Sequence, residues 1–148
     1  KSEMAKIASL GEFTPLQMAQ RAQINSGQTL QGTDEERTVS VGRQLQEMGY
    51  GGIWQHPDFH YDTGYAKGAG TADGFTPTRK NKGSYHNSKR ALDIGLQANG
   101  PQRLEQLYQY LKKNKERFGV AELIYAPKGS GRYDPDGSHW HHVHVAFD

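Results

Sequence analysis

The chain has 148 residues, a net charge of +2 with histidine neutral, and only 34% hydrophobic residues. This length predicts one domain, or one domain with an appended helical segment. No stretch approaches the ~20 apolar residues that span a bilayer, so we expect no membrane association. The small net charge does not favour nucleic acid as a partner, and the absence of cysteine excludes disulfides.

The first third of the chain has the pattern of two helices. Thr14-Pro15 predicts a helix start, with an N-cap followed by proline in the first turn. Ser26-Gly27 predicts the end of this helix. A capping box that begins at Thr33 predicts a second helix, which we expect to end at Gly49.

A Gln- and Gly-rich stretch at 25–32 is typical of a linker. We therefore predict a helical segment or linker over residues 1–32 and the main domain over residues 33–148. The chain begins with Lys1 and shows no signal peptide. We expect it to be a fragment, a processed product or a domain released from a larger phage or bacterial protein.

The rest of the chain alternates between loops and short regular elements. Residues 51–83 are rich in Gly, Pro, Asp and Thr and read as a long loop with one short strand at 52–55. A helix starting at Pro101 carries an apolar stripe. Further strands are predicted at Ala91–Leu96, Val120–Ala126 and Trp140–Phe147. Strand, helix, strand, loop and strand predict a small α+β domain.

Histidine is concentrated in two places, and these are the most informative feature of the sequence. His86 is followed seven residues later by Asp93, and four more histidines lie at positions 139, 141, 142 and 144. His and Asp are zinc ligands, and three protein ligands leave a fourth position open, as in hydrolytic sites. Asp93 also lies within an apolar strand, where a carboxylate is costly unless it is paired or binds a metal.

Strand alternation sorts the C-terminal histidines. His142 and His144 should point to the same face of the last strand, with the apolar residues between them on the core face. His141 should point away from both. His139 precedes the strand, so alternation does not fix its direction. A His-X-His pair alone is more often a surface feature, but its combination with His86 favours a metal site.

Two motifs resemble the LAS-type zinc peptidases. Ser84-Tyr85-His86 with Ala91-Leu92-Asp93 is similar to the family signature Ser-X-His-X-X-Gly-X-Ala-X-Asp, and His142-Val143-His144 is similar to its His-X-His. The group includes D-Ala-D-Ala metallopeptidases, phage endolysins and lysostaphin-like enzymes, and it shares its fold with the hedgehog signalling domain. The resemblance covers roughly residues 50–148. Lys89 stands where the family has glycine.

The resemblance implies a small antiparallel sheet with flanking helices, long Gly-rich loops and one zinc ion. Its ligands would be His86, Asp93 and His144. The resemblance further implies that His139 is a general base or an electrostatic partner of the oxyanion, and that His142 assists it. The alternative base is His141, at the position three residues before the last ligand where related enzymes often carry Glu.

A basic run precedes and overlaps the first motif. No acid lies between Asp73 and Asp93, whereas five cations do: Arg79, Lys80, Lys82, Lys89 and Arg90. Such a run either attracts an anionic substrate or is a solvated loop. The family resemblance makes Arg79 the candidate for holding a substrate carboxylate.

An aromatic and histidine cluster lies further upstream. It consists of Trp54, His56, Phe59, His60 and Tyr61. The cluster either lines a substrate groove, or Trp54 belongs to the core while the others lie on the loop surface. We expect the second arrangement.

The resemblance implies a hydrolase that cuts peptide bonds in bacterial peptidoglycan, as an endopeptidase or a D,D-carboxypeptidase. Its partners would be peptidoglycan stem peptides, and we expect a monomer that acts outside the cell or at the cell wall or periplasm. The alternative is a non-catalytic zinc-binding module of the hedgehog kind, and a zinc peptidase of another specificity is a further option. A pure binding module has no need of His139 and His142.

Overall fold

A four-stranded sheet forms the centre of the fold in the computed structural model, which describes residues 14–59 and 83–148. The strands are β1 (Ile53–Trp54), β2 (Ala91–Gly95), β3 (Val120–Ile124) and β4 (His142–Phe147). Their order is β1-β2-β4-β3, and every neighbouring pair is antiparallel. The predicted α+β class with a small antiparallel sheet and flanking helices is confirmed.

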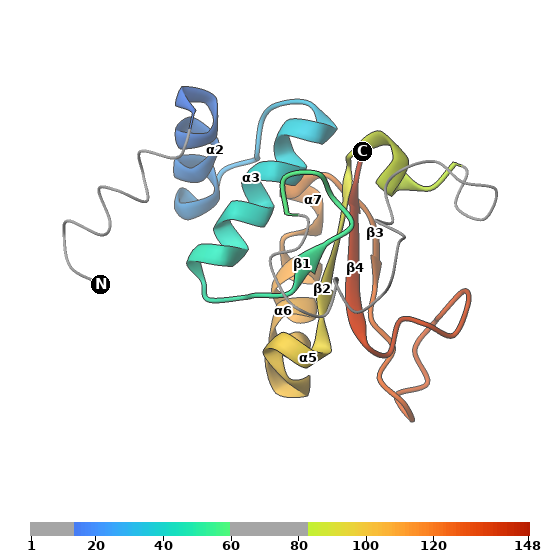
Figure 1. The fold of residues 1–148 in the computed structure, drawn as a ribbon. Helices are drawn as coiled ribbons and strands as arrows, with labels where there is room; N and C mark the ends of the chain where they lie inside the picture. The colour runs from blue at the N-terminus through green and yellow to red at the C-terminus, as the bar shows by residue number, and fades with distance from the viewer. Residues whose placement is uncertain (1–13, 60–82) are drawn as a thin grey trace.

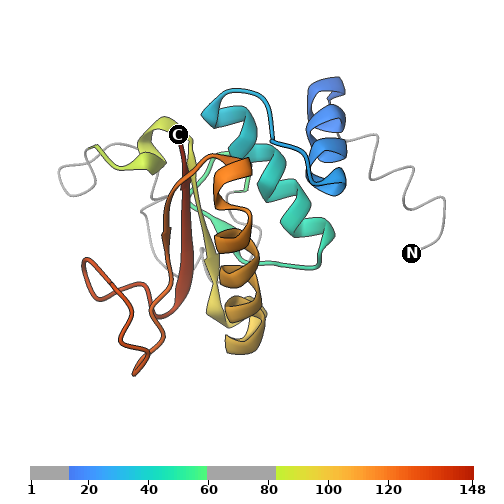
Figure 2. The ribbon, with the colours of Figure 1, turned by 180° about the vertical axis from the view of Figure 1, so that it is seen from behind.

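The helices gather on one side of this sheet (Figures 1 and 2). They are α2 (Pro15–Ser26), α3 (Asp34–Glu47), α5 (Leu96–Asn99), α6 (Pro101–Lys113) and α7 (Lys115–Phe118). A short 3-10 helix, η1 (Tyr85–Ser88), directly precedes β2. Within the described ranges, no helix is long and apolar enough to cross a membrane.

Strand alternation and a helical apolar stripe build the core. Leu104, Leu107 and Leu111 follow helical spacing on α6, and all three side chains are buried. They belong to the same buried cluster as Leu92 of β2 and Val143 of β4. The helices α3 and α6 both contact β4. These core side chains thus cover one face of the sheet, and the opposite face is not part of this core.

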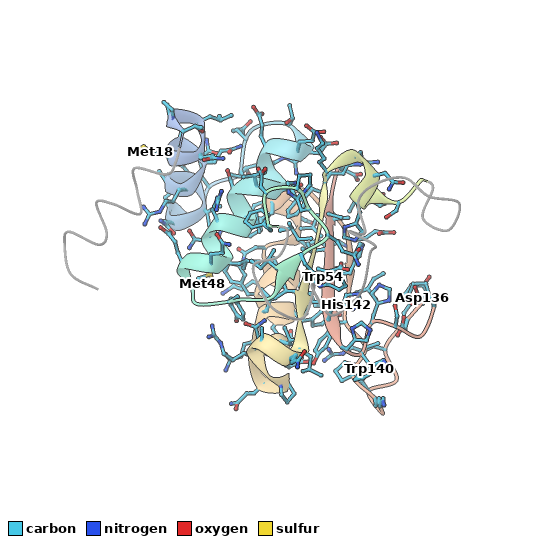
Figure 3. The ribbon with its side chains drawn as sticks, in the orientation of Figure 1. Met18, Met48, Trp54, Asp136, Trp140 and His142 are labelled. Atoms are coloured by element: carbon cyan, nitrogen blue, oxygen red, sulfur yellow. The ribbon has the colours of Figure 1, made fainter. Side chains whose placement is uncertain are left out.

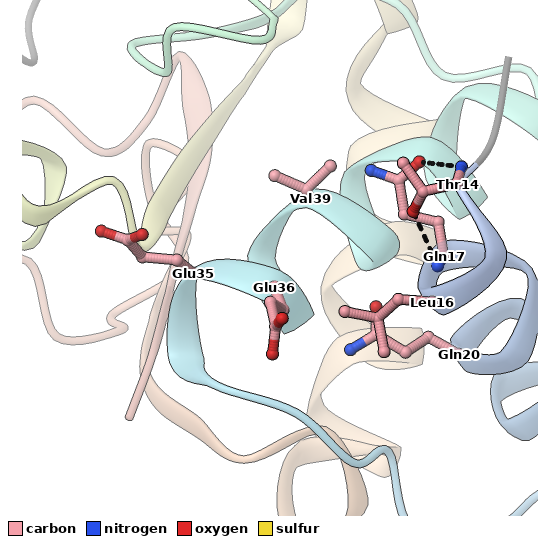
Figure 4. Close-up of a pocket in the computed structure, with 7 residues that line it drawn as sticks. All are labelled: Thr14, Leu16, Gln17, Gln20, Glu35, Glu36 and Val39. Atoms are coloured by element: carbon pink, nitrogen blue, oxygen red, sulfur yellow. Dashed lines mark hydrogen bonds between the residues drawn. The ribbon is translucent and has the colours of Figure 1, made fainter.

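The N-terminal helices begin at the predicted caps. Thr14 and Gln17 exchange two hydrogen bonds of 3.1 Å at the start of α2 (Figure 4), and Thr33 forms the same box with Glu36 at the start of α3. A cavity of about 220 Å³ lies between these helix starts. None of the described residues that line it is a histidine. They are Thr14, Leu16, Gln17, Gln20, Glu35, Glu36 and Val39.

The segment that we expected to be a linker is packed against the rest of the chain. Ile24 and Leu30 are each 4% exposed and belong to the main core cluster. The guanidinium of Arg117 donates hydrogen bonds to the carbonyls of Ile24 and Gln28. The division at residue 32 stays a prediction, although the described residues on its N-terminal side contribute to the shared core.

Some element boundaries differ from the prediction. The last strand begins at His142, two residues later than predicted, because its partner β2 ends at Gly95, which pairs with His142. The chain then turns from Gly95 into α5, and the N–H of Leu96 donates to the carbonyl of His141 at 2.8 Å. β3 ends at Ile124, before the predicted Ala126. The short helices η1, α5 and α7 were not predicted.

Candidate metal centre

The predicted ligand residues meet on the face of the sheet opposite the core. Asp93 of β2 and His144 of β4 are paired directly across the ladder, so both side chains point to the same face. His86 reaches them from η1. All three residues are buried, and one ligand-type atom from each lies within 4.8 Å of the others. The residues therefore form a group that could hold a metal ion.

The turn that carries His86 is built by the first motif. The hydroxyl of Ser84 accepts a hydrogen bond from the N–H of His86 at 3.2 Å and caps η1. The C-cap of this helix is Lys89, whose φ of 60° and ψ of 32° lie in the left-handed region. Glycine adopts this region without a steric cost, and glycine is the residue that the resemblance places here. Lys89 therefore adopts this conformation at the expense of backbone strain.

One oxygen of Asp93 faces two imidazole nitrogens. Oδ1 lies 3.3 Å from Nε2 of His86 and 3.1 Å from Nδ1 of His144. The other nitrogen of His86, Nδ1, lies 3.0 Å from the carbonyl oxygen of Gln55. Because a carbonyl only accepts, Nδ1 carries a proton, and in the neutral ring the lone pair of Nε2 faces Asp93.

His144 is oriented in a similar way from its other side. Its Nε2 lies 2.9 Å from Oε1 of Glu122 on β3. In the neutral ring, a proton on Nε2 that Glu122 accepts leaves the Nδ1 lone pair directed at Asp93. Two lone pairs and a carboxylate oxygen then surround one point, and they repel one another unless a cation or a proton lies between them. Outer carboxylate and carbonyl partners of this kind are typical of metal-binding histidines.

The charges of this cluster are strongly coupled. Burial alone would raise the pKa of Asp93, but the charges of His86 and His142 and hydrogen bonds from His144 and His86 lower it well below its usual value. Burial likewise acts to lower the pKa of His144, yet its hydrogen bonds and charge interactions with Asp93 and Glu122 raise it overall. Asp93 is therefore ionised at neutral pH and available to a cation.

The two proposed catalytic histidines lie beside this group and line the same cavity, which has a volume of about 300 Å³. His139 comes from the loop before β4, and its ring centroid is 4.8 Å from that of His142 and 5.7 Å from that of His144. Figure 3 shows His142 and Asp136 on the side of the sheet away from α2 and α3. Burial lowers the pKa of His142 to about 4, with partial compensation from Asp93, so its ring is neutral at pH 7.

His139 is held by two acidic residues of its own loop. Its Nδ1 lies 2.8 Å from Oδ1 of Asp134 and 3.1 Å from Oδ1 of Asp136. Asp134 also accepts the backbone N–H groups of Gly137 and His139 at 3.0 Å each, which fixes the loop. Nδ1 thus carries a proton, and Nε2 is the nitrogen that bears the lone pair when the ring is neutral.

The expectation that His141 points away from His142 is wrong, whereas its direction relative to His144 stays a prediction. Because β4 begins at His142, strand alternation does not reach His141, and its Nδ1 lies 3.0 Å from Nδ1 of His142. His141 does not line the described part of the cavity. Trp140 likewise lies outside the strand, and its ring packs edge-on against that of His141. His141 can therefore affect the cavity through His142.

The basic run is only partly described. Arg79, the candidate for the substrate carboxylate, lies outside the described residues together with Lys80 and Lys82. Arg90 stacks on the ring of Tyr85 at 4.3 Å and is within 4 Å of two carboxylates on other segments. Among the described residues, no lysine or arginine lines the cavity. The role of the run in substrate binding stays a prediction.

The upstream aromatic cluster is more buried than expected. His56 and Phe59 are each 2% exposed, so the expectation that they lie on the loop surface is wrong. Trp54 is buried, as expected. His60 and Tyr61 lie outside the described residues.

Sequence reasoning missed three partners of the site: Glu122, Asp134 and the carbonyl of Gln55. Glu122 carried a usable signal, because it is an acid within an apolar strand, as is Asp93. Asp134 lies in a loop with a second aspartate, and nothing in the sequence indicates which of the two is the main partner of the site. Gln55 acts through its backbone, which leaves no trace in the side-chain pattern.

Comparison with protein-family models, with curated proteins and with solved structures gives no match for this chain. The two motifs and the geometry around them therefore carry the functional argument.

Proposed function

We propose that the chain is a zinc-dependent peptidase that cuts stem peptides of bacterial peptidoglycan, with a fold of the LAS and hedgehog kind. The observation that carries the proposal is the pair of distances of 3.3 and 3.1 Å from one Asp93 oxygen to nitrogens of His86 and His144. A tetrahedral zinc ion with bonds of ~2.0–2.1 Å places its ligand atoms about 3.3 Å apart. The two distances match the edges of such a tetrahedron.

The donor set favours zinc among the biological cations. Magnesium and calcium prefer oxygen ligands, whereas two imidazoles with one carboxylate suit zinc. Three protein ligands are also the number found in catalytic zinc sites. When bound, zinc would polarise a scissile carbonyl and lower the pKa of a water molecule toward ~7.

The other residues of the cavity support catalysis rather than storage of the metal. The bond to Asp134 leaves Nε2 of His139 as a proton acceptor, as a general base requires. The neutral ring of His142 would offer hydrogen bonding to the charge that develops on the substrate. A zinc-binding module without activity requires neither group. The peptidoglycan substrate is supported by the resemblance of the two motifs, and with it an action at or outside the cell wall.

The test combines metal analysis with a digest of purified peptidoglycan. Wild type should contain one zinc per chain and release peptide fragments that mass spectrometry identifies, and a chelator should abolish cleavage. His86→Ala and His144→Ala should lose zinc and activity together. Tyr133→Ala serves as the control, because this side chain is 77% exposed on the same loop as His139.

The possible failures are separable. Full zinc occupancy in both alanine variants would show that the ligand assignment is wrong. A wild-type protein that binds zinc at this site and leaves peptidoglycan intact would instead favour the binding module.

A further inference from the structure

Backbone strain is concentrated at two places beside the metal centre. Among the described residues, only Gln55 and Lys89 combine a side chain with a positive φ, at 62° and 60°. Gln55 directly follows β1, and Lys89 ends the turn that carries His86. Strained residues of this kind persist only where their surroundings hold them, and they gather at functional sites.

Two consecutive residues after β1 hold the two ends of the His86 turn. The carbonyl of Gln55 accepts from Nδ1 of His86 at 3.0 Å. The next residue, His56, places its Nε2 3.1 Å from the carbonyl oxygen of Lys89. The backbone N–H of Asp58 donates to Nδ1 of His56 at 3.0 Å, so the proton of this ring is on Nε2 and is donated to Lys89.

The environment of His56 makes this connection rigid. The residue is 2% exposed, and its ring lies 5.5 Å from the ring of Phe59. Both ring nitrogens have partners, so the buried imidazole has no unsatisfied group and one preferred orientation. His56 does not belong to the ligand group, and it does not line the cavity.

We propose that His56 is a positioning residue of the metal centre. Its bond to Lys89 holds the left-handed end of the turn, while Gln55 fixes the imidazole of His86, so that Nε2 faces Asp93 before a metal ion arrives. Without this bond, the turn would relax away from its strained conformation. Zinc binding would then have to order the turn again, and this cost would lower the affinity for zinc. The proposal rests on the zinc centre proposed above.

Two substitutions separate the two nitrogens of His56. Glutamine places an amide nitrogen near the position of Nε2 and can still donate to Lys89. Asparagine places an oxygen near the position of Nδ1, so it keeps the bond from Asp58 and loses the bond to Lys89. His56→Asn should weaken zinc binding by up to ~10-fold, the lower end of the loss for a group that bonds a metal ligand directly, because His56 acts through the turn. His56→Gln should stay near wild type.

The measurement is competition for zinc against a chromophoric chelator, below the unfolding transition of every variant. Adding Lys89→Gly to His56→Asn should recover much of the affinity, because glycine keeps φ near 60° without the bond. Asn99→Ala is the control for lost stability. Asn99 bonds Gly51 and Gly95 at the opposite end of β1 and β2, so its loss should lower thermal stability without changing zinc affinity.

The outcomes separate this role from the function of the site. His56→Asn with wild-type zinc affinity would overturn the positioning role and leave the zinc centre standing. An equal loss in His56→Gln and His56→Asn would overturn it as well, since the donor to Lys89 would then be irrelevant. A wild-type chain that binds no zinc refutes the centre itself and this role with it.

Discussion

Removal of the Glu122 carboxylate should weaken metal binding without removing a ligand. Glu122 accepts from Nε2 of His144 at 2.9 Å and so directs the opposite nitrogen at Asp93. Partners of this kind contribute ~10–100-fold to affinity. The Glu122 side chain is 42% exposed, and solvent screens exposed pairs. We therefore expect a loss of about 10-fold for Glu122→Ala, equivalent to ~1.4 kcal/mol.

The assay is a zinc competition titration at constant pH and ionic strength. Glu122→Gln should lose less than Glu122→Ala, because the amide oxygen still accepts from His144. Glu105→Gln is a matched control that removes the same charge from α6, where Glu105 binds Arg132 at 2.7 and 2.9 Å. It should leave zinc affinity unchanged. If Glu122→Ala binds zinc as tightly as wild type, Glu122 does not orient the ligand and the reasoning is refuted.

Three further changes test the turn, the catalytic histidine and the N-terminal segment. Lys89→Gly should raise the unfolding temperature by roughly 1–4 °C. The reason is that relief of ~1–2 kcal/mol of left-handed strain exceeds the ~0.5–1 kcal/mol entropic cost of glycine. An unchanged unfolding temperature would argue against strain at Lys89. His139→Ala should keep zinc and the fold while kcat falls by ~10²–10⁴-fold, and His141→Ala should cause a smaller loss of kcat. The reverse ranking of the two variants in a peptidoglycan digest would assign the general base to His141. Deleting residues 1–32 removes Ile24 and Leu30, the two core-cluster side chains in the described part of this segment, at ~1.5–3 kcal/mol each. Thermal unfolding should therefore occur at a lower temperature while the folded protein still cleaves. A folded, inactive product would show that this segment completes the site.

The elements that sequence reasoning located correctly are those whose signals are local. The cap at Thr14, the box at Thr33 and the leucine stripe that follows Pro101 each lie within a few residues of the helix they define. Asp93 was equally readable, because a lone carboxylate in an apolar strand requires a partner. The structure provides that partner in His86, His142 and His144.

The features that were missed depend on a partner far away in sequence. The start of β4 is decided by the end of β2, because the last residue of β2, Gly95, pairs with His142, which lies 47 residues later in the chain. No pattern within β4 indicates this boundary. The contact of His141 with His142 follows from that boundary, so the expectation that these two side chains point apart was wrong as well. The left-handed conformation of Gln55 leaves no signal either, since its functional group is a backbone carbonyl.

The local and the long-range signals correspond to two halves of the proposed metal centre. Asp93 and His144 are neighbours across the ladder of the two central strands, so the hydrogen bonds of the sheet fix their relative positions. His86 stands on a single turn of 3-10 helix, and the carbonyl of Gln55 accepts from its ring, while the side chain of His56 donates to the carbonyl of Lys89 at the end of the turn. Substitutions in the sheet should therefore change zinc affinity and stability together. Apart from the relief of strain in Lys89→Gly, substitutions around the turn should change affinity more than stability, because few backbone ladder bonds depend on them.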